Sequence, residues 1–132
     1  DDIIKWFIEM RDRGFKIEQV GFDQKFGREF FLGMKLHRFR IENTPQLYYL
    51  KSEGFRRIEK KVKDGKFYYL HSEAFEYCVQ NVRAIEQTDD AIKYEKLADN
   101  MRIDVFDATV FAAMQMLKHI QKSEVARTWL KS

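Results

Sequence analysis

The stretch Met101-Arg-Ile-Asp-Val-Phe-Asp-Ala-Thr-Val-Phe-Ala-Ala-Met-Gln-Met-Leu117 decides how the fold is interpreted. It places two carboxylates, Asp104 and Asp107, at the start of a nearly all-apolar segment. We expect a last helix there, from Asp104 to about Gln121. Asp104 would be its N-cap, and Asp107 would lie in the first turn, where acidic side chains stabilise the positive end of the helix dipole. Simple capping would explain both residues.

A third aspartate gives this pair a second interpretation. The segment Ile17-Glu-Gln-Val-Gly-Phe-Asp23 predicts a short strand over residues 16–22 that ends on Asp23. A carboxylate at a strand end and another at a helix start can meet at one edge of a sheet. Such an arrangement suits a two-metal site that cleaves phosphodiester bonds. Asp23 could equally be an ordinary residue of a strand-to-helix turn.

The rest of the chain alternates between helical and strand patterns. We expect helices over residues 3–14, 27–36, 44–63, 72–81 and 104–121, strands over 16–22, 38–41 and 67–70, and a hairpin over 82–96. Thr44-Pro45 is the best local start signal for a helix, and Asp89-Asp90 marks the turn of the hairpin. Strands that alternate with helices indicate an α/β layered fold.

Composition limits the class of protein. The 132 residues, 45% of them hydrophobic, suffice for one domain with a buried core, and the net charge is only +3. The single Cys78 excludes an internal disulfide and is expected to be buried on a helix. No apolar run reaches the roughly 18 residues of a membrane span, so we expect a soluble intracellular domain. The chain begins without methionine, and we interpret it as a piece of a longer polypeptide.

Several residue types could carry chemistry. Basic residues crowd the predicted helix 44–63 and its exit: Lys51, Arg56, Arg57, Lys60, Lys61, Lys63 and Lys66. They form either a solvated outer face or a set of phosphate contacts, and the pattern alone does not decide. The three histidines are too far apart for a zinc site. No GxxxxGK[ST] loop is present, so we expect no ATP hydrolysis by this piece.

Short blocks along the chain add a resemblance. They are Gly21-Phe22-Asp23, Gly65-Lys66-Phe67 followed by Phe75-Glu-Tyr-Cys-Val-Gln-Asn81-Val82, then Lys96, and finally Arg102-Ile103-Asp104 before an alanine-rich helix. From about Ile17 to Leu117 their order and spacing resemble the C-terminal nuclease domain of phage terminase large subunits. In that family the corresponding motifs read "GYD", "GKL…LxWCxxNV", a lysine and "RID".

The resemblance implies a ribonuclease H-like fold, with residues 1–132 as the C-terminal part of one nuclease domain. It implies Mg²⁺- or Mn²⁺-dependent endonuclease cleavage of double-stranded DNA, with Asp23 and Asp104 as metal ligands and Asp107 as a helper. Lys96 and Arg102 would contact phosphates, with Arg56, Arg57, Lys60 and Lys61 as further DNA-binding candidates. Partners would be DNA, other terminase proteins and the portal, in the cytoplasm of a bacterial host, from a phage or prophage gene.

The sequence also departs from the family. Tyr69 and Glu73 stand where the family often has a histidine and then a proline. The family's first metal-binding aspartate lies on a strand upstream of Asp23, and this chain begins at a helix instead. We therefore expect a fold truncated at its N-terminal strands, and weak or absent cleavage by this piece alone. Two alternatives stay open: a non-enzymatic DNA- or protein-docking module of the packaging complex, and another ribonuclease H-like enzyme of the resolvase or integrase type.

Overall fold

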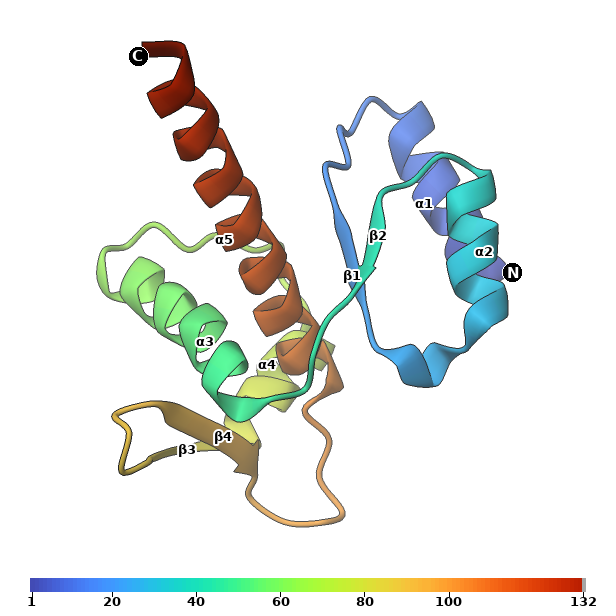
Figure 1. Cartoon of the computed structure of the whole chain (residues 1–132). Coiled ribbons are helices and arrows are strands. Elements are labelled where there is room, and N and C mark those ends of the chain that lie inside the picture. The colour runs from blue at the N-terminus through green and yellow to red at the C-terminus, as the bar shows by residue number, and fades with distance from the viewer. Residues whose placement is uncertain (132) are drawn as a thin grey trace. The chain divides into compact units, whose positions relative to one another are not determined.

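The structure, a computed structural model, describes residues 1–131, apart from the side chains of residues 26, 123, 130 and 131 (Figure 1). The chain divides into two compact units, Asp1–Pro45 and Gln46–Ser132, and each is considered on its own. Both units combine helices with a two-stranded sheet, so the expected α/β class is confirmed. That the whole chain forms one domain stays a prediction.

The first unit is built around a pair of parallel strands. Its elements are α1 (Asp2–Asp12), β1 (Val20–Phe22), the 3₁₀ helix η1 (Gln24–Phe26), α2 (Arg28–Leu36) and β2 (Ile41–Asn43). Parallel strands need a crossover connection, and α2 supplies it. Val20 pairs with Ile41 and Phe22 with Asn43. Val20 and Ile41 are buried with Met34 of α2, so the core lies between the strands and the helices.

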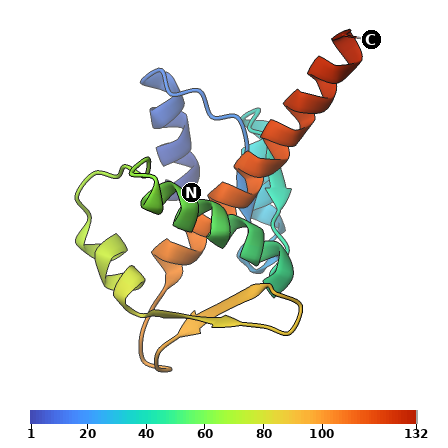
Figure 2. The same cartoon turned by 90° about the vertical axis from the view of Figure 1, so that its left-hand side faces the viewer.

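The second unit packs two long helices against a hairpin. Its elements are α3 (Tyr48–Lys63), α4 (Glu73–Gln80), β3 (Val82–Glu86), β4 (Ile92–Lys96) and α5 (Asp104–Lys131). The hairpin is antiparallel, with Ala84 opposite Tyr94. Figures 1 and 2 show α3 crossing the first half of α5, while the second half of α5 extends beyond the other elements of this unit. The core joins Cys78, Tyr94, Phe106 and Val110.

Two small residues of α3 set its distance from its neighbours. A Cβ on Gly54 would lie 2.8 Å from the carbonyl oxygen of Val110 and 2.9 Å from Cγ of Met114, so the two helices approach closely there. The hydroxyl oxygen of Ser52 accepts a 2.8 Å hydrogen bond from the backbone N–H of Ile92. Helix α3 is therefore tied to both α5 and the hairpin.

Several expectations are confirmed. The helix expected over 27–36 is α2, and the hairpin expected over 82–96 is present with Asp90 at a left-handed φ of 64° in its turn. Ser72 caps α4, because its hydroxyl accepts from the N–H of Phe75 at 3.2 Å. Cys78 is buried, with 4% of its surface exposed.

Two expectations about the middle of the chain were wrong. The helix expected from Thr44 begins at Tyr48 instead. Thr44 is buried, and its N–H donates to the carbonyl of Phe22 at 2.8 Å, which continues the parallel ladder past β2, so the chain is still bonded to the end of β1 at this residue. No strand forms over residues 67–70. Tyr68 and Leu70 are 85% and 92% exposed, because no neighbouring strand covers them.

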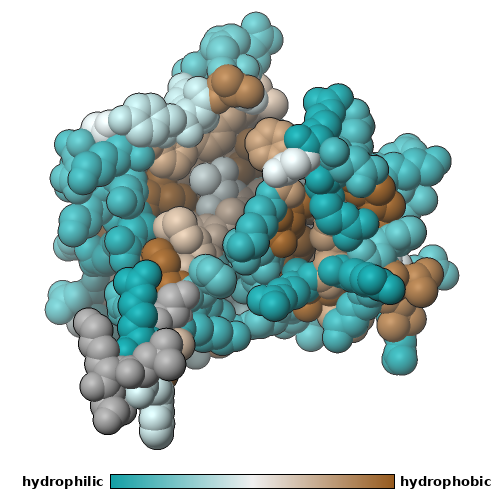
Figure 3. All heavy atoms as spheres, turned by 90° about the horizontal axis from the view of Figure 1, so that it is seen from above, coloured by the Kyte–Doolittle hydropathy of each residue, from teal (hydrophilic) through white to brown (hydrophobic). Residues whose placement is uncertain are grey.

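The last helix begins at Asp104, as expected, but it ends later than expected. It continues to Lys131, ten residues past the expected end at 121, in a stretch without glycine or proline to stop it. Asp104 is its first helical residue, one position after the N-cap position that was also expected for it. Exposed apolar residues lie along its second half, and Figure 3 shows apolar side chains reaching the surface between hydrophilic ones.

Candidate functional site

Asp104 presents its carboxylate to solvent at the start of α5. The nearest cation is the guanidinium of Arg102, whose Nη1 lies 3.9 Å from Oδ2 of Asp104. The two side chains are 79% and 77% exposed, so this ion pair is weak and screened by water. The Asp104 carboxylate is therefore accessible to a second cation.

The loop before Asp104 is fixed by Asn81. This residue is buried, and its side-chain amide donates to the carbonyl of Arg102 at 3.0 Å. Its own carbonyl accepts from the N–H of Leu97 at 2.8 Å. Both ends of the loop 97–102 are thus held by one buried residue, through its side-chain amide at Arg102 and its backbone carbonyl at Leu97. Lys96, the last residue of β4, shares a strand face with Tyr94 because side chains alternate along a strand.

Asp107 lies one turn further in and has a different environment. The ammonium nitrogen of Lys51 lies 2.9 Å from Oδ1 of Asp107, and the side chains are only 16% and 25% exposed. The same oxygen accepts a hydrogen bond from the Tyr94 hydroxyl. Lys51 also donates to the side-chain oxygen of Gln46 at 3.1 Å. A partly buried cluster of Lys51, Asp107, Tyr94 and Gln46 therefore joins α3, β4 and α5.

The aromatic rings around Lys51 reinforce this cluster. The ammonium lies 4.7 Å from the ring centre of Tyr94 and 5.5 Å from that of Phe111. Burial, and then the hydrogen bond to the Asp107 carboxylate, raise the pKa of the Tyr94 hydroxyl far above its usual range. Tyr94 therefore stays protonated as a donor. Asp107 already has a cation and a donor, so its surroundings do not fit a metal ligand.

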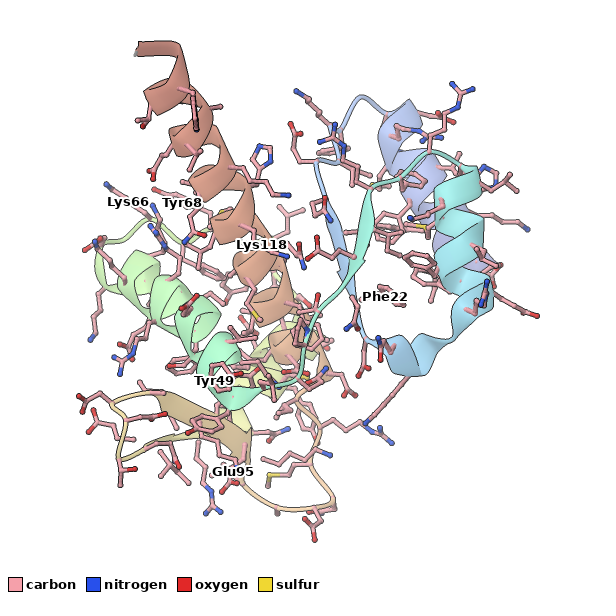
Figure 4. The ribbon with its side chains drawn as sticks, in the orientation of Figure 1. Phe22, Tyr49, Lys66, Tyr68, Glu95 and Lys118 are labelled. Atoms are coloured by element: carbon pink, nitrogen blue, oxygen red, sulfur yellow. The ribbon has the colours of Figure 1, made fainter. Side chains whose placement is uncertain are left out.

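Asp23 lies at the end of β1 in the first unit. Its Oδ1 accepts a hydrogen bond from the N–H of Lys25 at 3.0 Å, and the residue is half-buried. It follows Phe22, which Figure 4 labels and whose ring stacks on Phe31 of α2 at 5.5 Å. The predicted position at the end of a strand is confirmed. The strand belongs to a parallel pair, and ligands of open α/β sheets bind outside such carboxyl ends.

Asp23 and Asp104 belong to different units, so their meeting at one sheet edge stays a prediction. Within residues 1–131, no three His, Cys, Asp or Glu side chains gather as they would around a single metal ion. In the same part of the chain, no helix has the length and apolar character that crossing a membrane requires.

The basic residues of α3 differ in their surroundings. Arg56 donates to the carbonyl of Asp90 in the hairpin turn, and Lys63 pairs with Glu59 at 3.5 Å. Lys60 is exposed, whereas Arg57 and Lys61 are half-buried. Lys66, labelled with Tyr68 in Figure 4, follows the end of the helix. The cluster seen in the sequence is therefore spread around α3, and part of it has a structural role.

The sequence did not identify Tyr94, Asn81 or the pairing of Lys51 with Asp107 as parts of this region. A weak signal for Tyr94 existed, since Ile92 and Tyr94 alternate with charged residues along β4 and both are buried. Asn81 belonged to a block of the family resemblance, but its bond to Arg102 spans 21 positions and has no local signature.

Comparison of this chain with models of known protein families, with curated proteins and with solved structures gives no match.

Proposed function

We propose that this chain supplies part of a divalent-metal-dependent endonuclease site for double-stranded DNA, in a ribonuclease H-like fold of the kind found in phage terminase large subunits. The contrast between Asp104 and Asp107 carries the proposal. Asp107 is satisfied by Lys51 and Tyr94 within the second unit, whereas Asp104 faces solvent from an anchored backbone. An exposed carboxylate on a fixed support is what a metal ligand requires.

The residues present fit a divalent cation in part. Asp104 and Asp23 offer carboxylate oxygens, the ligand type that Mg²⁺ and Mn²⁺ prefer. Asp107 does not fit, because the Lys51 ammonium 2.9 Å away would repel a metal ion. When bound, a pair of such ions activates the attacking water and stabilises the leaving oxygen. In this proposal Asp107 has a structural role in joining α3, β4 and α5, and Asp23 and Asp104 hold the metal.

Two cations near Asp104 support contact with DNA. Asn81 holds the backbone of both Leu97 and Arg102, which keeps Lys96 and Arg102 in one region beside the start of α5. Phosphate contacts of this kind position a duplex without reading its sequence. The proposed Arg102 contact would replace its weak pairing with Asp104 once a metal neutralises that carboxylate.

The proposal is tested by nicking of supercoiled plasmid DNA with Mn²⁺ or Mg²⁺, using the full protein that contains this chain. Asp104→Asn is expected to abolish cleavage and to change stability little, by about 0.3–1 kcal/mol from the helix dipole. Asp107→Asn is expected to lower stability and to reduce cleavage only in proportion to lost folding. Asp99→Asn, an exposed carboxylate in the loop before α5, is the matched control.

Full cleavage by the Asp104→Asn protein would overturn the metal assignment and leave Asp104 as a helix-start residue. DNA binding that persists in the absence of any cleavage by the wild-type protein would favour the docking module instead. The chain of 132 residues alone is expected to cleave weakly or not at all.

A further inference from the structure

A cavity of about 490 Å³ opens at the carboxyl ends of β1 and β2 in the first unit. This volume is within the range of about 300–1,000 Å³ that is typical of small-molecule sites. Its walls come from the ends of both strands, from η1 and from the start of α2. The lining residues are Phe22, Gln24, Gly27, Arg28, Phe31, Ile41, Glu42 and Asn43.

The apolar part of the cavity lining is largely aromatic. The ring centres of Phe22 and Phe31 lie 5.5 Å apart with an interplanar angle of 26°, and the buried Ile41 also lines the cavity. Phe22, labelled in Figure 4, is the last residue of β1. A planar heteroaromatic ring is the ligand that packs best on such a surface, because every base has a π face for stacking.

The polar lining is suited to the rest of a nucleotide. The amides of Gln24 and Asn43 each offer donors and an acceptor, which match the mixed donors and acceptors on the edge of a base. The guanidinium of Arg28 has the fork geometry that binds phosphate. Glu42 also lines the cavity, and a carboxylate can accept from a sugar hydroxyl or an exocyclic amine.

We propose that this cavity binds one nucleotide unit, with the base against Phe22 and Phe31 and the phosphate at Arg28. The same chemistry has two sources: a free mononucleotide, or an unpaired nucleotide within a DNA strand. Asp23 directly follows Phe22 in the chain, so a strand nucleotide in the cavity would bring its backbone toward a proposed metal ligand. Only this link to a DNA strand rests on the proposed function.

The test measures binding in EDTA, so that it does not depend on metal or on cleavage. The probes are deoxyadenosine 5′-monophosphate, deoxyadenosine, deoxyribose 5-phosphate, and a DNA hairpin with one unpaired 2-aminopurine beside its fully paired counterpart. The full chain is expected to bind deoxyadenosine 5′-monophosphate about tenfold more tightly than it binds deoxyadenosine or deoxyribose 5-phosphate. The reason is that stacking and phosphate contacts both contribute to binding of the mononucleotide. If the protein quenches 2-aminopurine fluorescence in the hairpin with the unpaired base but not in the fully paired hairpin, the ligand is a nucleotide within a DNA strand.

Variants locate the binding. Arg28→Gln should weaken binding of the mononucleotide about tenfold, because it removes one charge-assisted contact with the phosphate. Binding of deoxyadenosine, which has no phosphate, should be unchanged. Asn43→Ala should weaken the mononucleotide and the nucleoside alike, and Gln24→Ala, at an exposed position, is the second choice if Asn43→Ala fails to fold. Lys5→Gln on α1 removes the same charge as Arg28→Gln outside the cavity, and is the control.

Absence of binding by both the mononucleotide and the unpaired hairpin overturns the proposal. Binding that is equal in wild type, Arg28→Gln and Asn43→Ala also overturns it. If the wild-type protein binds the nucleotide but does not cleave plasmid DNA with either metal, the nuclease proposal is overturned and the proposed nucleotide site stands.

Discussion

The ammonium of Lys51 on α3 lies 2.9 Å from the carboxylate of Asp107 on α5, and both side chains are largely buried. The Tyr94 hydroxyl on β4 donates to the same carboxylate. One acidic residue thus connects three elements of the second unit. The relationship separates the two aspartates of the first turn of α5, since Asp107 faces inward and Asp104 faces water.

Removing the Lys51 cation from this cluster should destabilise the folded protein. Lys51→Met is expected to lower the free energy of unfolding by about 1–3 kcal/mol, because it leaves the Asp107 charge partly buried without its counterion. Denaturant unfolding measures the change, and Lys60→Met at an exposed position of the same helix is the control. In a double-mutant cycle, Lys51→Met with Asp107→Asn should lose less than the sum of the single changes. Additivity within about 0.5 kcal/mol would mean that the pair does not interact.

Gly54 should tolerate no side chain. Gly54→Ala places a Cβ 2.8 Å from the backbone oxygen of Val110, so α3 and α5 must separate. We expect a loss of about 1–3 kcal/mol from overpacking, although alanine favours a helix. Gly33→Ala on α2 is the matched comparison, since its Cβ would meet only the mobile end of Ile4 at 2.6 Å. Equal effects at the two positions, read from thermal unfolding, would argue against the close helix contact.

Tyr94 should resist ionisation in the folded chain. Its folded pKa is raised above the ordinary value of 10.0, so the protonated hydroxyl contributes stability that is fully present below about pH 10 and is lost as pH rises. Tyr94→Phe should therefore leave the tyrosinate absorbance of the folded protein unchanged. Above pH 10 the free energy of unfolding should fall less steeply with pH in the variant than in the wild type, and the two slopes should differ by about 1.4 kcal/mol per pH unit. A drop in the folded-state tyrosinate signal on substitution would show that Tyr94 titrates normally.

The salt dependence of DNA binding should distinguish two sets of cations. Lys96→Ala with Arg102→Ala is expected to lower the log–log slope by about 1.8, or about 0.9 for each phosphate contact. Lys60→Ala with Lys61→Ala removes the same charge, and it should lower the slope by about 0.9 at most because Lys61 is half-buried. Titrations of duplex DNA at several salt concentrations measure both. A larger effect at Lys60 and Lys61 would place the duplex along α3 instead.

Local signals in the sequence predicted much of the secondary structure. The hairpin expected at Asp89-Asp90 is present, the Ser72 cap starts α4, and the helix after Gly27 forms. The same kind of signal was wrong at Thr44-Pro45. The N–H of Thr44 donates a hydrogen bond to the carbonyl of Phe22. These residues are 22 positions apart, and a capping rule considers only neighbouring residues.

The candidate site shows the same division. The sequence alone determined that Asp104 and Asp107 share the first turn of α5 and that Asp23 ends a strand, because these positions follow from periodicity and from the adjacency of residues. Only the tertiary structure decided which of the paired carboxylates is available. Lys51 and Tyr94 lie 56 and 13 positions from Asp107 along the chain, and the packing of α3 and β4 on α5 brings them to it. Burial and ion pairing depend on such distant contacts, and for this reason the roles of two aspartates three residues apart could not be separated from their sequence.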